Sequence, residues 1–142
     1  MTANSAWEAL LRAHAVLVKR FNSEDVWGDL SMREYDVLYT LSKCETPVRL
    51  GELNKHVLLS QPAMSRMVDR LVERGLIARE TDPADRRGLR LSLTDRGRAV
   101  QREIGARHAR GVAAAMTAAL SPAELRQLET LLRKLTDQEE PK

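Results

Sequence analysis

The clearest pattern of apolar and polar positions lies between residues 60 and 75. Its apolar residues recur at the i, i+3, i+4, i+7 spacing of a single helix face: Met64, Met67, Val68, Leu71 and Val72. Ser60 is placed to cap the start of the helix, Pro62 is tolerated in the first turn, and Gly75 supplies a left-handed stop. The spacing therefore predicts an amphipathic helix with well-defined ends.

The opposite face of this helix is polar and has two interpretations. It carries Gln61, Ser65, Arg66, Asp69, Arg70 and Glu73. Short or planar polar side chains near a helix start can read base edges in a DNA major groove, which favours a recognition helix. Simple solvation also produces a charged helix face, so the helix alone leaves both interpretations open.

Three helices are predicted before this segment. Residues 5–22 carry a stripe of four turns, and residues 23–30 interrupt it as a loop; the stripe consists of Trp7, Leu10, Leu11, His14, Leu17, Val18 and Phe21. Ser31 and Glu34 form a capping box that opens a helix to about Ser42. Residues 50–57 predict a short helix with Leu53 and Val57 facing inward, and residues 58–59 turn into the next helix.

After Gly75 the apolar period changes from that of a helix to that of a strand. LIARE (76–80) reads as a short strand, and TDPADRRG (81–88) reads as a basic loop rich in turn formers. In LRLSL (89–93) the leucines alternate with polar residues, the period of a half-buried strand. Two strands around a basic loop predict a hairpin that resembles a wing.

Two further helices are predicted at the C-terminal end. Thr94 caps a long helix over about 95–119, whose apolar stripe drifts around the axis and whose Ala and Gly residues allow a close helix neighbour. Ser121 and Glu124 form a second capping box, followed by a leucine stripe: Leu125, Leu128, Leu131, Leu132 and Leu135. The apolar stripes at both ends of the chain are too long for one small lobe to bury.

Composition narrows the class of protein without deciding it. The chain has 142 residues, 43% of them hydrophobic but few aromatic, with a net charge of +3 and a pI of about 9.3, so nucleic-acid binding is permitted but not demanded. No apolar run is long enough for a membrane span and no signal-peptide layout opens the chain, so a cytoplasmic location is expected. No catalytic constellation, phosphate loop or metal-ligand spacing stands out, so neither an enzyme nor a cofactor or metal is expected.

The run from Arg49 to Gly97 resembles the MarR family of bacterial transcriptional regulators. The residues that match it include Glu52-Leu53, Ser60, Ser65-Arg66, Asp69-Arg70-Leu71, Gly75-Leu76-Ile77, Arg79, Asp85-Arg86-Arg87 and Leu91-Ser92-Leu93-Thr94 with Gly97. The Asp-Arg-Arg run, followed by a strand that ends in Leu-Thr and then by Gly, is the most specific part.

The resemblance implies a mainly α fold, a winged helix-turn-helix with a helical dimerisation domain built from both chain termini. Residues 1–30 and 95–142 would then dimerise, and residues 31–94 would form the DNA-binding lobe. It also implies an obligate homodimer, most simply a repressor, on a pseudo-palindromic operator whose half-sites lie about 10 bp apart.

Seven residues are candidates for contact with DNA, five on the recognition helix and two in the wing: Ser60, Gln61, Ser65, Arg66, Arg70, Arg86 and Arg87. Arg66 is expected either to bind guanine bidentately or to contact phosphate. One of the two wing arginines is expected to enter the minor groove, and the other to brace the wing by pairing with Asp69 or Asp85.

Many members of the family bind small aromatic or phenolic ligands in a cleft between the lobe and the dimerisation helices. Six residues could line such a cleft: Trp7, His14, Trp27, Tyr35, Asp36 and Tyr39. The Tyr35-Asp36-Val37-Leu38 run is loosely similar to a run in the urate-responsive branch. The alternative is that these aromatic residues are core and that His14 belongs to the dimer interface.

Other possibilities are narrower. Cys44 is expected to be a small buried residue rather than a redox switch, because the hydroperoxide-sensing branch carries its cysteine near the start of the chain. His56 and His108 show no spacing typical of a metal site. The competing function is a dimeric interaction protein of the same fold without specific DNA binding.

Overall fold

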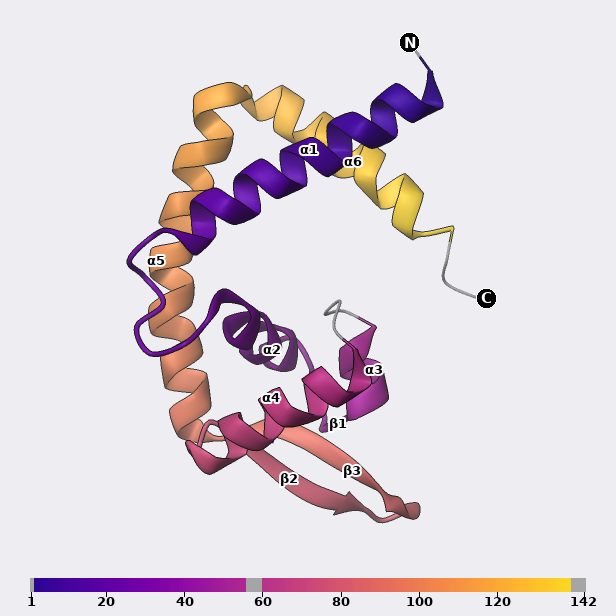
Figure 1. Ribbon diagram of the computed structural model, residues 1–142, viewed down its shortest axis with the longest axis vertical. Helices are drawn as coiled ribbons and strands as arrows, with labels where there is room; N and C mark the ends of the chain where they lie inside the picture. Colours follow the sequence, from indigo (N-terminus) through magenta and orange to yellow (C-terminus); the bar gives the residue numbers. More distant parts are fainter. Residues whose placement is uncertain (1, 56–59, 139–142) are drawn as a thin grey trace.

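The computed structural model of the protein describes residues 2–55 and 60–138, and within them the side chains of Gln61, Arg86 and Arg87 are not described. The elements follow the order α1 (Ala3–Asn22), α2 (Met32–Ser42), β1 (Val48–Arg49), α3 (Leu50–Asn54), α4 (Gln61–Glu73), β2 (Ile77–Asp82), β3 (Asp85–Leu93), α5 (Asp95–Ala119) and α6 (Pro122–Thr136). A lobe of α2, α3, α4 and the sheet lies beside one end of α5, and α1 and α6 lie toward the other end (Figure 1).

The core lies inside this lobe and draws on each of its elements. Seven large apolar side chains among the described residues are less than 2% exposed: Val37, Leu38, Leu53, Met64, Leu71, Ile77 and Leu91. Burying an aliphatic side chain of this size contributes about 1.5–3 kcal/mol. The predicted apolar face of α4 is therefore confirmed as the face that holds this helix on the lobe.

The three strands form an antiparallel sheet in the order β1-β3-β2. Val48 pairs with Leu91 at one edge, and Ile77 pairs with Leu93 at the other. The sequence did not predict β1, because two residues are too few to show a period. Its prediction of an eight-residue loop was also wrong, since β2 runs on to Asp82 and β3 begins at Asp85.

The start of α5 is locked to the turn that follows α4. Gly75 has a φ of +75°, which confirms the predicted left-handed stop. Thr94 Oγ1 donates to the Gly75 carbonyl at 2.6 Å, and the Thr94 N–H donates to the Leu76 carbonyl at 3.2 Å. A Cβ atom at Gly97 would lie 2.0 Å from the Leu76 carbonyl oxygen, so only glycine permits this approach.

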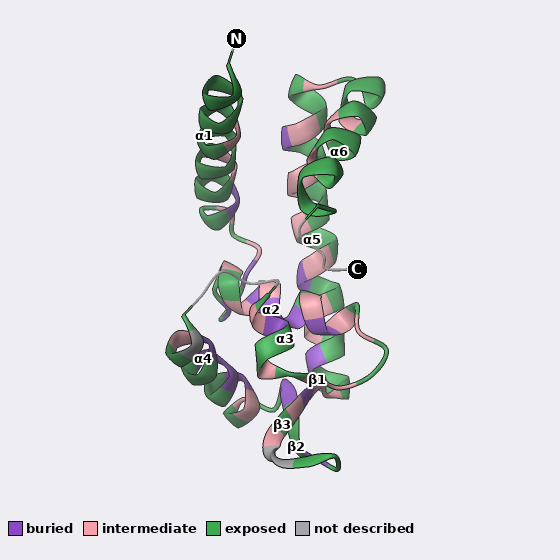
Figure 2. Cartoon of the chain, turned by 90° about the vertical axis from the view of Figure 1, so that its right-hand side faces the viewer, coloured by how far each residue is buried: buried purple, intermediate pink, exposed green. Residues whose placement is uncertain are grey.

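The helices at the two ends of the chain stand apart from the lobe and are largely exposed (Figure 2). The predicted caps of α5 and α6 are confirmed, since Thr94 accepts from the Gly97 N–H and Ser121 and Glu124 form a capping box. Large apolar side chains nevertheless face solvent on both helices: Trp7, Leu11, Val16, Val18, Leu131 and Leu135. The predicted positions of Val57, Leu58 and Leu59 lie outside the described residues.

Candidate nucleic-acid interface

The outer face of α4 is polar, exposed and close to the helix start. The Ser60 hydroxyl accepts from the Ala63 N–H at 3.2 Å, so this predicted DNA residue also caps the helix. Ser65, Arg66 and Arg70 are exposed on the face opposite the buried methionines. The first turn carries no acidic residue, so the positive end of the helix dipole is left available to a phosphate. The side chain of Gln61 lies outside the described part of the structure.

An ion pair joins α4 to the sheet. Arg79 on β2 donates to the Asp69 carboxylate of α4 in a short, partly exposed contact. The sequence predicts Asp69 as one of two possible partners for a wing arginine, and in the structure Asp69 pairs with Arg79. The pair balances the negative charge of Asp69, which shares α4 with Ser65 and Arg66, and joins this helix to the hairpin.

A second ion pair joins β1 to the hairpin near the hairpin tip. Arg49, the last residue of β1, donates from Nε at 2.9 Å and from Nη2 at 2.6 Å to Asp82 Oδ2, and it lies 3.6 Å from Asp85. Asp82 Oδ1 accepts the Ala84 N–H at 2.9 Å, which shapes the tight turn between the strands. The hydrogen bonds from the Ala84 N–H and from Arg49 hold the pKa of the Asp82 carboxyl below its usual range.

The Arg49 guanidinium also lies against the backbone of the wing. A Cβ atom at Gly88 would be 3.1 Å from Arg49 Nη2, so the group packs closely over this glycine. Glu80 and Arg90 face each other across the strands and pair at 3.4 Å. The backbone of Arg86 and Arg87 belongs to β3 just after the turn, while their side chains lie outside the described part of the structure. Sequence reasoning missed Arg49, because its partner is 33 residues away.

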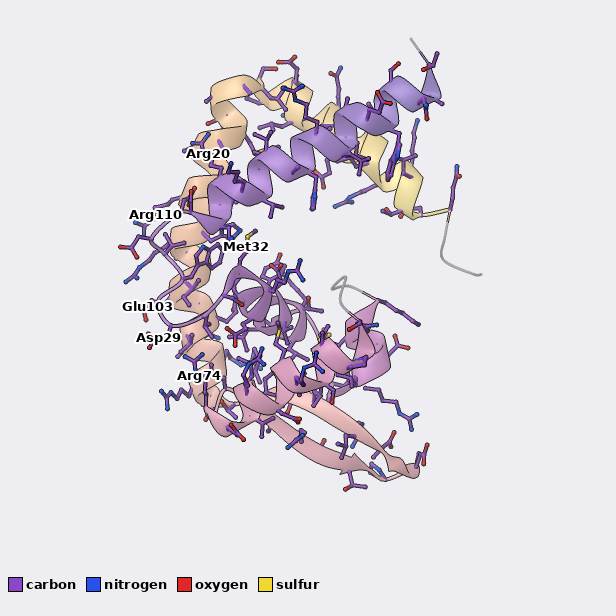
Figure 3. All side chains as sticks on the ribbon, in the orientation of Figure 1. Arg20, Asp29, Met32, Arg74, Glu103 and Arg110 are labelled. Carbon is purple, nitrogen blue, oxygen red and sulfur yellow. The ribbon has the colours of Figure 1, made fainter. Side chains whose placement is uncertain are left out.

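The lobe also contacts the loop before α2. Arg74 at the end of α4 donates to the Asp29 carbonyl oxygen at 3.3 Å; both residues are labelled in Figure 3. This contact, together with the close approach of Gly97 to the Leu76 carbonyl, holds the end of α4 against the rest of the molecule.

A cleft opens between α2, α5 and α6, with a volume of about 640 Å³. Three of the six predicted ligand residues line it, namely Tyr35, Asp36 and Tyr39. Trp27 is buried behind it, and Trp7 and His14 lie on the exposed face of α1, outside the lining. The lining also includes His108, which is not among the six residues predicted from the sequence.

His108 sits at the centre of an aromatic cluster. Its ring centroid lies 4.8 Å from that of Trp27, 5.4 Å from Phe21 and 5.7 Å from Tyr35. The Trp27 indole N–H donates to the Phe21 carbonyl at 2.9 Å, which satisfies its buried polar atom. Trp27 and Tyr35 are therefore core residues, as the alternative interpretation held, although Tyr35 also borders the cleft.

Two titratable groups of the cleft are shifted by burial. Desolvation raises the pKa of the Asp36 carboxyl, and the positive field of His108 opposes that shift. Desolvation also raises the pKa of Tyr35, whose hydroxyl oxygen lies 3.5 Å from Gln101 Nε2 on α5. His108 Nδ1 is buried without a hydrogen-bond partner among the described residues.

Other chemistry is sparse in the part of the chain that the structure describes. Cys44 is half-buried rather than fully buried, and its thiol donates to the Thr40 carbonyl at 3.3 Å. Across residues 2–55 and 60–138, no group of three acidic, histidine or cysteine side chains is placed to hold a metal ion. None of the described helices combines the length and apolarity that crossing a membrane requires.

Comparison with known proteins places these features in a family. Residues 30–89 match the MarR family. The multiple antibiotic resistance protein MarR of Salmonella typhimurium is 33% identical over 109 residues, which cover 75% of this chain and 74% of that protein. Both the lobe and part of the flanking helices are thus shared with a curated relative.

Two solved structures extend the similarity to nearly the whole chain. Sco3205, a MarR family transcriptional regulator from Streptomyces coelicolor in complex with DNA, has a TM-score of 0.82 and 26% identity, covering 99% of this chain and 91% of its own. BpsR of Bordetella bronchiseptica, whose DNA binding is regulated by 6-hydroxynicotinic acid, has a TM-score of 0.78 and 29% identity, covering 93% and 98%. The chain therefore belongs to the MarR family of DNA-binding transcriptional regulators and has their winged helix fold.

Proposed function

We propose that the protein is a homodimeric repressor that binds a pseudo-palindromic operator, with α4 in the major groove and the β2–β3 hairpin at the adjacent minor groove. The observation that carries this proposal is the ion pair between Asp69 and Arg79, which holds the polar face of α4 and the wing in one rigid unit. In a dimer, two such units would contact two half-sites about 10 bp apart.

The exposed apolar faces of the terminal helices support the dimer. Trp7 and Val16 on α1 are 56% and 58% exposed, and Leu131 and Leu135 on α6 are 59% and 61% exposed. Apolar stripes of this extent on a folded chain mark an interaction surface. A second copy is the partner we propose, with residues 1–30 and 95–142 forming the dimerisation domain and residues 31–94 the DNA-binding lobe.

Within the lobe we assign separate roles to the exposed residues. Arg66 is our candidate for guanine recognition, worth about 1–3 kcal/mol of discrimination between bases. The other four candidates on this helix are assigned to DNA contacts beside that of Arg66, including contacts with phosphate: Ser60, Gln61, Ser65 and Arg70. Phosphate contacts set the position of the protein on DNA rather than its sequence preference. For the minor groove we retain Arg86 and Arg87, one of which would enter it.

A small aromatic ligand in the cleft would regulate DNA binding. The cleft joins α2 of the lobe to α5 and α6, so a ligand there contacts both parts of the molecule. It shifts the arrangement of the two lobes only if it binds one arrangement more tightly than the other. Regulation of DNA binding by 6-hydroxynicotinic acid in the similar BpsR supports a ligand of this kind.

Fluorescence anisotropy tests the central proposal. Labelled duplexes tiled across the intergenic DNA beside the gene would be titrated at two salt concentrations, with a scrambled duplex as control. Tight binding to one tile that falls steeply with salt is the expected result. Equal, weak binding to every tile and to the scrambled duplex would contradict it and favour an interaction protein.

A further inference from the structure

Helix α5 runs from the lobe to the terminal helices, and it contacts the lobe side of the molecule at two separated points (Figure 1). The first point is the close approach of Gly97 to the Leu76 carbonyl. The second surrounds His108, about 16 Å further along the helix axis at a rise of about 1.5 Å per residue. A single contact leaves a rigid body free to turn about it, whereas two separated contacts define its orientation.

Trp27 contacts each of the segments that meet at the second point. Its ring centroid lies 4.8 Å from that of His108 on α5 and 5.4 Å from that of Tyr35 on α2. Its indole N–H donates at 2.9 Å to the carbonyl of Phe21, a buried residue at the end of α1. Aromatic rings at these separations attract each other, and the indole N–H adds a directional bond. One buried side chain therefore holds α1, α2 and α5 together.

The backbone that carries Trp27 has a defined turn. Gly28 has a φ of +61°, in the left-handed region, and the Leu30 N–H donates to the Trp27 carbonyl at 3.1 Å. The side chains of Trp27 and Leu30 are both buried. The Glu24 carboxylate lies over Gly111 of α5, where a Cβ atom would collide with it. The segment between α1 and α2 is thus packed against α5 and is not a free linker.

The orientation of the lobe on α5 decides where one recognition helix lies relative to the recognition helix of a second copy. One base pair added between two half-sites moves them apart by about 3.4 Å and turns them by about 35° around the duplex axis. A lobe held at both points follows such a change only by breaking the contacts of Trp27. A lobe held only at the start of α5 follows it more easily.

We propose that Trp27 is a positioning residue that sets which half-site spacing the dimer accepts. The inference rests on the proposed binding of a dimer to a two-part operator and adds a determinant of spacing to it. Residues of α4 and of the wing contact each half-site separately, so they do not supply this determinant. Trp27 acts through its contacts with α1, α2 and α5, because it is buried and does not itself reach DNA.

Operator duplexes with one base pair inserted or removed between the half-sites test the proposal. In anisotropy titrations of the full chain, the native protein should bind the altered duplexes at least about tenfold more weakly than the operator, as if one good base contact were lost. Trp27→Leu should reduce this ratio to about threefold or less, because leucine supplies neither the ring contacts nor the N–H bond. Trp27→Phe should give an intermediate ratio, since it keeps a ring and the Phe21 carbonyl still accepts the Glu24 N–H.

Leu53→Val is the matched control. Leu53 is buried on α3 inside the lobe, so the variant loses core packing without changing the contacts of Trp27. A general loss of stability lowers the affinity for all duplexes alike and leaves the ratio between spacings as in the native chain. Circular dichroism of each variant shows whether it is folded.

The same titrations separate this proposal from the proposed function. If the native chain prefers its operator to scrambled DNA but accepts the altered spacings equally well, the proposal is overturned and the DNA-binding function stands. An unchanged ratio in folded Trp27→Leu, or an equal loss of the ratio in Leu53→Val, also overturns it. Should Trp27→Leu fail to fold, an unchanged ratio in Trp27→Phe overturns it instead. A native chain that prefers no duplex to scrambled DNA refutes the proposed function and this proposal with it.

Discussion

Arg49 and Asp82 join the start of the helix-turn-helix to the far end of the wing. The guanidinium donates twice to one carboxylate oxygen, at 2.9 and 2.6 Å, while the other oxygen accepts the Ala84 N–H. The side chain of Asp82 is 12% exposed and that of Arg49 is 47% exposed. The pair therefore joins the end of β2 to the residue before α3, and so holds the hairpin against the helix-turn-helix.

This geometry predicts that Asp82→Asn weakens operator binding. The asparagine keeps an oxygen for the Ala84 N–H but loses the charged partner of Arg49, so the wing should lose its fixed angle. We expect a loss of about three- to tenfold in affinity, comparable with one charge-assisted hydrogen bond. Anisotropy on the operator duplex measures it.

The sign of the effect distinguishes positioning from simple electrostatics. Removing a negative charge beside DNA should by itself raise affinity. Glu80→Gln is the matched control, because Glu80 carries the same charge on the same strand but pairs with Arg90 in an exposed position. Equal affinities in the two variants would show that Arg49 does not act through Asp82.

The same carboxylate makes stability depend on pH in the acid range. The pKa of Asp82 is lower in the folded chain than its value of about 3.9 when unfolded. Its interactions therefore stabilise the fold above the unfolded pKa and are lost as the pH falls through the folded pKa. Urea midpoints of the natural chain and Asp82→Asn should differ by a constant amount from about pH 7 to about pH 5 and converge below about pH 4. A difference that persisted into stronger acid would contradict this assignment.

Features that depend on residues close together in the sequence were predicted correctly, and features that depend on distant residues were not. The caps at Ser31, Thr94 and Ser121 and the apolar face of α4 are local patterns, and all were predicted correctly. The strand β1, the true length of the hairpin and the partner of Asp69 depend on residues far apart in the sequence, and period and propensity do not report such pairs. His108 was missed for the same reason, because its aromatic neighbours come from α2 and the preceding segments.

Gly97 should be irreplaceable for steric reasons. Gly97→Ala places a Cβ atom 2.0 Å from the Leu76 carbonyl oxygen, and backbone must move to accept it. We expect a loss of at least about 1–3 kcal/mol in the free energy of unfolding, the usual cost of overpacking. Gly51→Ala is the control, because its Cβ would meet nothing within 4 Å. Urea denaturation compares the two, and a similar stability in both would refute the steric argument.

The proposed dimer predicts a difference between neighbouring positions on α6. Leu131 is apolar and 59% exposed, whereas Thr130 beside it is exposed and polar. Leu131→Glu should raise the dimer dissociation constant by at least about tenfold, because burying an unpaired carboxylate in an apolar interface is unfavourable. Thr130→Glu should leave it nearly unchanged. Sedimentation at several concentrations measures both variants, and a native chain that sediments as a monomer would contradict the dimer itself.

Arg66 and Arg70 should fail in different ways if their roles are assigned correctly. Both are exposed on α4, but Arg66 lies closer to the helix start, the part of a recognition helix that reaches base edges. Arg66→Ala should lose about 1–3 kcal/mol on the operator and relax the preference for guanine at one position. Arg70→Ala should weaken binding to all duplexes alike and reduce the slope of log K against log salt by about one. Anisotropy on the operator, on singly substituted operators and on scrambled DNA at several salt concentrations separates these outcomes. If Arg66→Ala weakens every duplex equally, Arg66 contacts phosphate, and the reading of sequence must rest with other residues near the start of α4.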